Sequence, residues 1–193
     1  GGFWYASKDK AVPAEGEPIK IGALIPFTGN LARYGELEKQ GLELAKEELN
    51  QKGGINGRPI EVVYEDTQGN PAQALSAWNK LMLDKDIQMV IAAISSTCQA
   101  LSPLANDKQI VLMSVECAVA EYSSPDDFTF RVMASTADEA KEMSRFLIDR
   151  GVKKVSILQI ANDYGNSLFN NFEPSYTALG GEILRHEAYQ GDS

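Results

Sequence analysis

One stretch of the chain, from Ile19 to Asp66, contains a complete strand–helix–strand unit. The short apolar run Ile19–Ile25 predicts a strand that is covered on both faces. Apolar residues at helical spacing follow, and Gly53-Gly54 ends this predicted helix because glycine tolerates the left-handed backbone of a helix C-terminus. Ile60–Asp66 predicts the next strand. Two strands joined by one helix of this length imply a parallel, right-handed crossover.

The same alternation of strands and helices continues along the rest of the chain. Asn70 before Pro71 predicts a capped helix start, and a T-x-x-E capping box at Thr136 and Glu139 predicts another. A last helix is expected at Ser167–Leu179. The remaining predicted strands are Met89–Ile94, Ile110–Ser114, Phe128–Met133, Val155–Ile160 and Glu182–Tyr189. This pattern predicts an α/β fold with parallel sheets.

The predicted units divide the chain into three parts. Residues 1–18 form a charged tether behind an aromatic cluster, residues 19–133 a first α/β lobe, and residues 134–193 the beginning of a second, incomplete lobe. Two helices and two strands are few for an independent lobe, so a fragment is expected. The tether contains no signal peptide, and we expect that the chain was cut after an export signal or membrane anchor. A disordered or expression-derived tail is the alternative.

Charge and composition exclude several classes of function. The chain has 18 basic and 27 acidic residues, a net charge of −9 and a pI near 4.7. This charge argues against nucleic acid as a partner, since phosphates need a basic face. No apolar run approaches the roughly 18 residues of a membrane-spanning helix. One histidine and two cysteines match no zinc-ligand spacing, so no metal is expected.

The two cysteines, Cys98 and Cys117, each lie just beyond a predicted strand. Those strands are expected to be neighbours, so a disulfide between the two residues is feasible in an oxidising compartment. Two buried, unpaired thiols are the alternative, and the sequence leaves both open.

Ligands of open parallel sheets bind beyond the carboxyl ends of the strands, and this rule selects four loops. Ser95, Ser96 and Thr97 combine hydroxyl groups with free N–H groups at a predicted helix N-terminus, which suits a carboxylate or other anion. Plain helix capping is the alternative for this triplet. The four loops are Pro26–Tyr34, Ser95–Cys98, Ser114–Ala118 and Ala161–Gly165.

Two tyrosines and one glutamate are further candidates for ligand contact. Tyr34 and Tyr164 each lie beside a glycine in one of these loops, and an aromatic ring with a polar tip suits the wall of a small-molecule cleft. A half-buried surface tyrosine is the alternative for each. Glu116 faces the same predicted cleft and could receive an ammonium group, although an exposed glutamate is the commoner outcome.

Catalytic signatures are missing from the sequence. It contains no G-x-S-x-G elbow, no P-loop and no G-x-G-x-x-G motif. His186 lies late in a strand without an evident acid or nucleophile, and Glu65 and Asp66 point to opposite faces of their strand. We therefore predict no catalytic residue, no cofactor and no enzymatic activity.

The chain resembles the type I periplasmic binding proteins, in the leucine/isoleucine/valine-binding branch of ABC-transporter receptors. The resemblance rests on motifs that occur in family order from residue 19 to about residue 190: IKIGALIPFTGNLARYG, KGGINGRPIEVVYED, NPAQALSAWNKLM, VIAAISST, VLMS and NDYG. It implies parallel, doubly wound sheets in two lobes that close on a ligand about a hinge. The family's second lobe is longer and its chain returns to the first, so the resemblance implies truncation, completion by a partner segment, or exchange of elements in a dimer.

The resemblance also assigns roles to individual residues. It places the family's carboxylate-binding serine loop on Ser95, Ser96 and Thr97, and its two ligand tyrosines on Tyr34 and Tyr164.

One position departs from the family pattern. Where amino-acid binders usually have a ligand-contacting Ala-Thr, this chain has Cys117-Ala118. The resemblance therefore places ligand contacts on Cys117 and Ala118, but the threonine hydroxyl that helps hold the amino-acid head group is missing. Glu116 is also unexpected there. The ligand implied is then an aliphatic amino acid, an amide, a cationic amino acid or a small carboxylate.

The function implied is that of a solute-binding protein, periplasmic or at the cell surface, which delivers a small polar ligand to the membrane permease of an ABC transporter. The alternative is an extracellular ligand-binding sensor domain of a membrane receptor, and the sequence on either side of this segment decides between them.

Overall fold

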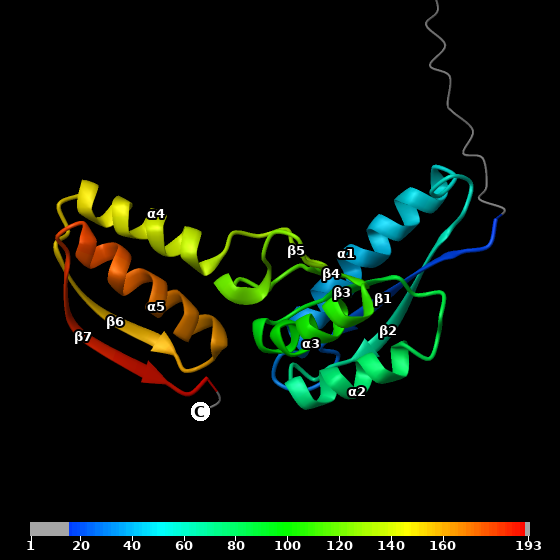
Figure 1. The fold of residues 1–193 in the computed structure, drawn as a ribbon, viewed down its shortest axis with the longest axis horizontal. Coiled ribbons are helices and arrows are strands. Elements are labelled where there is room, and N and C mark those ends of the chain that lie inside the picture. Colours follow the sequence, from blue (N-terminus) through cyan, green and yellow to red (C-terminus); the bar gives the residue numbers. More distant parts are fainter. Residues whose placement is uncertain (1–15, 192–193) are drawn as a thin grey trace, which may run out of the picture.

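The computed structural model describes residues 16–191, which form two parallel β-sheets with helices packed on them (Figure 1). Most of the predicted tether, residues 1–15, lies outside the described range. Within residues 16–191, none of the helices is both long enough and apolar enough to cross a membrane.

The first sheet has five strands in the order β2-β1-β3-β4-β5, and every neighbouring pair is parallel. The chain leaves β1 on one side to form β2 and returns on the other side as β3, so the topological switch point lies between β1 and β3. The strands are β1 (Ile19–Ile25), β2 (Ile60–Asp66), β3 (Met89–Ala92), β4 (Val111–Ser114) and β5 (Thr129–Arg131).

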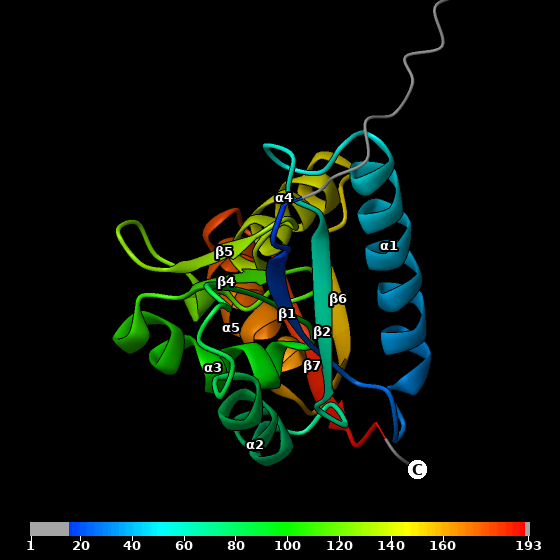
Figure 2. The same ribbon diagram turned by 90° about the vertical axis from the view of Figure 1, so that its right-hand side faces the viewer.

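Helices cover both faces of this sheet. Figure 2 shows α1 (Ala32–Gln51) on one side and α2 (Pro71–Leu81) with α3 (Ser95–Lys108) on the other. The main hydrophobic core lies under α2 and α3, where Trp78, Leu101 and Leu112 are buried. A short 3₁₀-helix, η1 (Ala120–Tyr122), follows β4.

The second sheet pairs β6 (Lys154–Ile160) with β7 (Glu182–Tyr189) in parallel. Helices α4 (Thr136–Asp149) and α5 (Asp163–Ala178) pack on one face around a small core that contains Phe172 and Tyr176. Because side chains alternate along a strand, Leu158 and Leu184 fall on the opposite face, where they are 71% and 58% exposed. Within residues 16–191 the chain passes between the sheets once, from β5 to α4.

Most predicted elements occur in the predicted order, and several of their boundaries are also confirmed. Asn70 caps α2 by accepting hydrogen bonds from two N–H groups of the first turn. After α1, Gly53 and Gly54 have φ angles of 94° and 70°, as expected of glycines that end a helix. The predicted strand Ile60–Asp66 is β2, residue for residue.

Two predicted helix starts are wrong. The residue that caps α4 is Ser135, whose Oγ accepts from the N–H of Asp138 at 3.2 Å, and not Thr136. The Thr136 hydroxyl is buried instead and lies 2.7 Å from Ser167 Oγ. Helix α5 begins at Asp163 rather than Ser167, because Asn162 caps it by accepting from the N–H of Gly165 at 2.9 Å.

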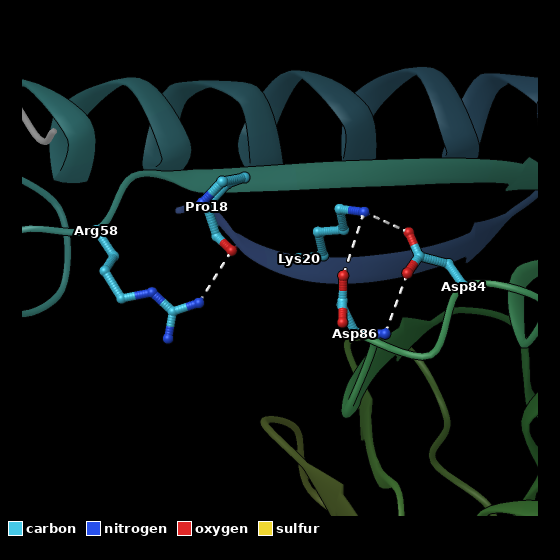
Figure 3. A network of polar contacts seen from close by, with 5 residues as sticks. All are labelled: Pro18, Lys20, Arg58, Asp84 and Asp86. Carbon is cyan, nitrogen blue, oxygen red and sulfur yellow. Dashed lines mark hydrogen bonds and ion pairs between the residues drawn. The ribbon is translucent and has the colours of Figure 1, made fainter. Parts of the chain in front are cut away.

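A polar network fixes the beginning of β1 (Figure 3). Lys20 Nζ donates to Asp84 Oδ2 at 2.6 Å and lies 3.7 Å from Asp86 Oδ2, while Arg58 donates to the carbonyl of Pro18 at 3.1 Å. The hydrogen bond between Lys20 and Asp84 raises the pKa of the lysine and lowers that of the aspartate. The network lies at the amino end of β1, opposite the edge where ligands of such sheets bind.

Candidate functional site

A pocket of ≈ 340 Å³ lies between the two sheets, beyond the carboxyl ends of β1, β3, β4 and β6. Each of the four loops selected from the sequence contributes to its wall. The first sheet provides the start of α1, the β3–α3 junction and the loop after β4, and the second provides the β6–α5 junction. The lining residues are Leu31, Tyr34, Ile94, Ser95, Ser96, Glu116, Ile160, Asn162, Asp163 and Tyr164.

The N-terminus of α3 opens onto this pocket. Ser95 and Ser96 are its first two residues, and the preceding Ile94 has a φ of 67°, which is rare for a β-branched residue. Among the described residues, no side chain accepts a hydrogen bond to cap this end, so the capping alternative is not observed. The unpaired N–H groups and the positive end of the helix dipole suit an anion.

Three residues that the sequence assigned to ligand contact lie beneath the pocket instead. Thr97, Cys117 and Ala118 have no exposed surface. The Thr97 hydroxyl donates to the carbonyls of Ala93 and Ile94, the latter at 2.9 Å. Because all three residues are buried, they support the floor of the pocket and are not among the residues that line it.

Tyr34 and Tyr164 face the pocket from the two lobes, 50% and 36% exposed respectively. Each lies in the first turn of a helix, and each is followed by a glycine. A Cβ on Gly35 would lie 1.7 Å from the carbonyl oxygen of Pro26, and one on Gly165 would lie 2.1 Å from that of Ile160. Only glycine therefore lets these helix starts pack against the chain that leaves the preceding strand.

The hydroxyl of Tyr164 is held by its own lobe. It donates to Glu139 Oε2 at 3.2 Å, and burial together with this neighbouring carboxylate raises the pKa of Tyr164. The bond fixes the ring of Tyr164 to α4, the helix that follows the connection between the lobes.

Glu116 meets a second carboxyl group at the edge of the pocket, that of Glu38 on α1. Both carboxyl oxygens of Glu38 are buried, and neither has a hydrogen-bond partner among the described residues. Burial, followed by the nearby charge of Glu116, raises the pKa of Glu38 to about 8. Glu38 therefore keeps its proton at neutral pH. The sequence does not single out Glu38, because the helical pattern cannot show which loop lies near it.

Arg131, a second residue missed from the sequence, holds the loop after β4. Its guanidinium donates to four successive carbonyls, those of residues 117–120, at 3.3, 3.1, 2.8 and 3.2 Å. It also lies over the ring of Tyr122, 5.5 Å from the centroid. The sequence offers little signal for this role, because Arg131 lies inside the predicted strand Phe128–Met133, whereas β5 ends at Arg131 and so brings it to the ligand edge of the sheet.

Both cysteines are free thiols in the structure, and both are fully buried. Cys98 Sγ lies 3.5 Å from Ser114 Oγ, and Cys117 Sγ lies 3.9 Å from the carbonyl oxygen of Ser95. Burial, and then the hydrogen bond with Cys117, raise the pKa of the Cys98 thiol well above its ordinary value. Of the two alternatives left by the sequence, the structure has the unpaired thiols.

We expect thiol titration of the unfolded, unreduced protein to find both thiols, Cys98 and Cys117. In the folded protein neither should react with a thiol reagent at pH 8, since both are buried and the Cys98 thiol stays protonated. Cys98→Ser is the matched control and should leave one titratable thiol. Absence of free thiol in the unfolded wild type would show a Cys98–Cys117 disulfide instead.

Larger hollows lie elsewhere in the described residues. Those of ≈ 570 and ≈ 580 Å³ are lined by residues of 17–89 and of 123–131 alone, which leaves two to compare. One of ≈ 840 Å³ runs along the outer face of α1 and is lined by that helix alone. The other, of ≈ 420 Å³, lies between α4, α5 and β6 and has no charged side chain in its lining. Neither brings charged or capping groups together from both lobes, as the pocket near Ser95 does.

The structure offers no candidate metal centre within residues 16–191, where no three His, Cys, Asp or Glu side chains gather suitably. His186 stacks on Phe169, with the ring centroids 3.5 Å apart, and is not among the residues that line the pocket.

Comparison with known proteins gives a consistent result. A family model described as "Periplasmic binding protein" matches residues 18–193. The Leu/Ile/Val-binding protein BraC3 of Rhizobium johnstonii is 29% identical over 178 residues, which are 90% of this chain and 48% of the relative. The chain spans about half the length of the curated relatives it matches.

Two solved structures resemble the chain closely in fold. The branched-chain amino acid transporter substrate-binding protein LivJ from Streptococcus pneumoniae, in complex with isoleucine, superposes with a TM-score of 0.79 at 29% identity, over 92% of this chain and 51% of that one. A solute-binding protein from R. palustris, in complex with benzoate, gives a TM-score of 0.79 at 23% identity, over 91% of this chain and 49% of that one.

Proposed function

Because this chain belongs to the periplasmic binding protein family, we propose that it is the ligand-binding part of an ABC-transporter solute receptor located outside the cytoplasm. It holds an amino acid or a related small carboxylate between its lobes. The lobes close on the ligand, and a membrane permease recognises the closed form. The protein binds its ligand without converting it.

The observation that carries this proposal is the lining of the pocket. The uncapped N-terminus of α3 comes from the first lobe and Tyr164 from the second. A volume of ≈ 340 Å³ falls within the ~300–1,000 Å³ that is usual for small-molecule sites. A ligand whose anionic group binds at the N-terminus of α3 and whose other end packs against Tyr164 would contact both lobes. Contact with both lobes couples ligand binding to their closure.

The contacts between the lobes also support hinge closure. Ser167 of α5 makes a small cluster of polar contacts close to the connection between the sheets. Its Oγ lies 2.7 Å from Thr136 Oγ1, accepts from the N–H of Ala120 at 3.3 Å and lies 3.4 Å from Glu121 Oε2. The contacts of Ser167 with Ala120 and Glu121 join the lobes close to the connection, where a hinge would lie.

Thermal unfolding of the intact protein tests the proposal. A panel of L-amino acids and small carboxylates, with L-isoleucine and benzoate among them, should contain ligands that raise the melting temperature. At one hundred times its Kd a ligand stabilises the folded state by about 2.7 kcal/mol. A complete panel without any shift would contradict the proposal.

Ser96→Trp tests where the ligand binds. An indole at this position would lie over the first turn of α3, so the ligand-induced shift should disappear while the protein stays folded. Ser76→Trp is the matched control, because Ser76 is exposed on α2 and makes no side-chain hydrogen bond. A full ligand shift in Ser96→Trp would show that the ligand binds elsewhere.

A further inference from the structure

The hydroxyl group of Ser167 is the centre of a nearly buried polar cluster. Ser167 is 8% exposed and Thr136 has no exposed surface. A hydroxyl donates one hydrogen bond and accepts two. Because the N–H of Ala120 can only donate and an ionised Glu121 can only accept, Ser167 donates to Glu121 and accepts from Ala120 and from the Thr136 hydroxyl. The hydroxyl of Ser167 is thus fully used. We refer to these four residues as the Ser167 cluster.

The Ser167 cluster is the main polar contact between the lobes. Within residues 16–191, the hydrogen bonds of Ser167 are the only ones that join β6, α5 or β7 to the first lobe. The first residue of α4 adds one more, since the N–H of Thr136 donates to the carbonyl of Ala118 at 2.6 Å. The angle between the lobes therefore depends on this cluster more than on any other polar contact of the described chain.

The part of the cluster that belongs to the first lobe is firmly held. The carbonyl of Ala120 accepts from Arg131 at 3.2 Å, while its N–H is the group that donates to Ser167. Two residues further on, the ring of Tyr122 is buried and its hydroxyl donates to the carbonyl of Leu112 at 2.8 Å. The short helix η1 is therefore fixed to the first sheet and provides a rigid surface for Ser167.

The part of the cluster that belongs to the second lobe is joined to the wall of the pocket. Tyr164 precedes Ser167 by three residues on α5, so the two lie on the same side of the helix about one turn apart. The start of this helix is held by the cap at Asn162 and by the close packing of Gly165 on the preceding strand. Helix α5 also contacts α3. Holding Ser167 against η1 therefore holds Tyr164 in place across the pocket from α3.

We propose that the Ser167 cluster keeps the two lobes in the arrangement that binds ligand. The inference rests on the proposed function and concerns the regulation of its site. Ser167 is a positioning residue, because it does not line the pocket and acts through Tyr164, which does. Without the hydroxyl the lobes separate more often. The apparent affinity for ligand then falls in proportion to the fraction of molecules that remain competent to bind.

The distance between the lobes in the absence of ligand tests the proposal first. Spin labels on Ser76→Cys of α2 and Glu173→Cys of α5 report this distance in the intact protein by pulsed electron paramagnetic resonance, since both positions are exposed and the native cysteines are buried. Ser167→Ala should broaden the distance distribution and shift its mean. An unchanged distribution would overturn the proposal.

Ser175→Ala is the matched control for this measurement. Ser175 lies on the same helix, but its hydroxyl donates to the carbonyl of Asn171 at 2.7 Å, within the helix itself. The substitution removes the same group without touching the first lobe, so the distance distribution should remain that of the wild type. A change equal to that of Ser167→Ala would show a general effect on α5 and would also overturn the proposal.

Ligand affinity tests the consequence for binding. Isothermal titration calorimetry of the intact protein with L-isoleucine and with benzoate should show at least threefold weaker binding in Ser167→Ala and no change in Ser175→Ala. A saturating probe should return the label distances of Ser167→Ala to those of the liganded wild type. Equal or tighter binding in Ser167→Ala would overturn the proposal and leave the receptor function standing. If no ligand bound to the wild type, the receptor function would be contradicted, and the distances without ligand would still decide on the cluster.

A double-mutant cycle tests whether the two hydroxyls act together. Thr136→Val removes the partner hydroxyl and keeps the shape of the side chain, so it should weaken probe binding less than Ser167→Ala does. Residues of one hydrogen-bond network give non-additive effects. The double variant should therefore bind about as weakly as Ser167→Ala alone. A loss equal to the product of the two single losses would show independent hydroxyls and contradict the cluster.

Discussion

Gly35→Ala is expected to lower the free energy of unfolding by about 3 kcal/mol and to weaken ligand binding. The added Cβ would lie 1.7 Å from the carbonyl oxygen of Pro26 and 2.5 Å from its carbonyl carbon. These are backbone atoms, and the neighbouring N–H of Phe27 is bound to Asp66 Oδ1 at 2.8 Å, so the loop cannot easily give way. The first turn of α1 must move instead, and Tyr34 moves with it.

Gly41→Ala on the same helix is the matched control and should have the opposite effect. No atom lies within 4 Å of a Cβ built at Gly41. Alanine is favoured over glycine in a helix interior by about 1 kcal/mol, so this variant should be more stable than the wild type. Denaturant unfolding of the two variants, with ligand affinity measured on the folded protein, checks both effects. Equal changes in the two variants would contradict the role assigned to the close approach at Pro26.

Arg131→Met is expected to lower the free energy of unfolding by about 3 kcal/mol, since it leaves carbonyl groups of the loop after β4 without their donor. Four hydrogen bonds are lost with the guanidinium, and the methionine replaces only its apolar stem. Ligand affinity should fall as well, because this loop positions Glu116. Arg131→Lys should recover little, since one ammonium group cannot span four successive carbonyls.

Arg145→Met provides the comparison for this substitution. Arg145 is exposed on α4 and pairs with Glu142 at 3.1 Å, an arrangement that contributes about 0.5 kcal/mol or less. Its replacement should leave stability and ligand affinity close to the wild-type values. If both arginine variants unfolded at the same denaturant concentration, the loop would not depend on Arg131.

Much of the fold follows from the sequence because local signals agree with one another. The run Ile19–Asp66 carries a buried strand, an amphipathic helix, a glycine stop and a second strand, and the structure has all four. The location of the pocket also follows, since the carboxyl ends of parallel strands meet at one edge of a sheet. The start of a helix is harder to predict where two adjacent residues can both act as the N-cap, as Ser135 and Thr136 can.

The carboxyl pair could not be predicted from the sequence. Glu38 lies on a helix with many other glutamates, and the local pattern is the same for those that face water. The effect of the Glu116 charge on Glu38 depends on how α1 lies across the sheet relative to the loop after β4, which is a matter of tertiary packing. Thr97 is the opposite case, in which the sequence predicted a ligand contact that the structure does not have. It lies in a serine-rich helix start, but its hydroxyl donates to backbone carbonyls instead.

In both lobes, the tyrosine that faces the pocket is followed by a glycine that packs closely against backbone atoms. Gly35 and Gly165 each let a helix start settle on the chain leaving a strand, so the aromatic walls are set by backbone packing rather than by the ligand. The loop that carries Glu116 lines the same pocket, but none of its residues is a glycine. Substitutions in that loop are therefore expected to change the pocket while the two aromatic walls and the sheets beneath them stay as they are.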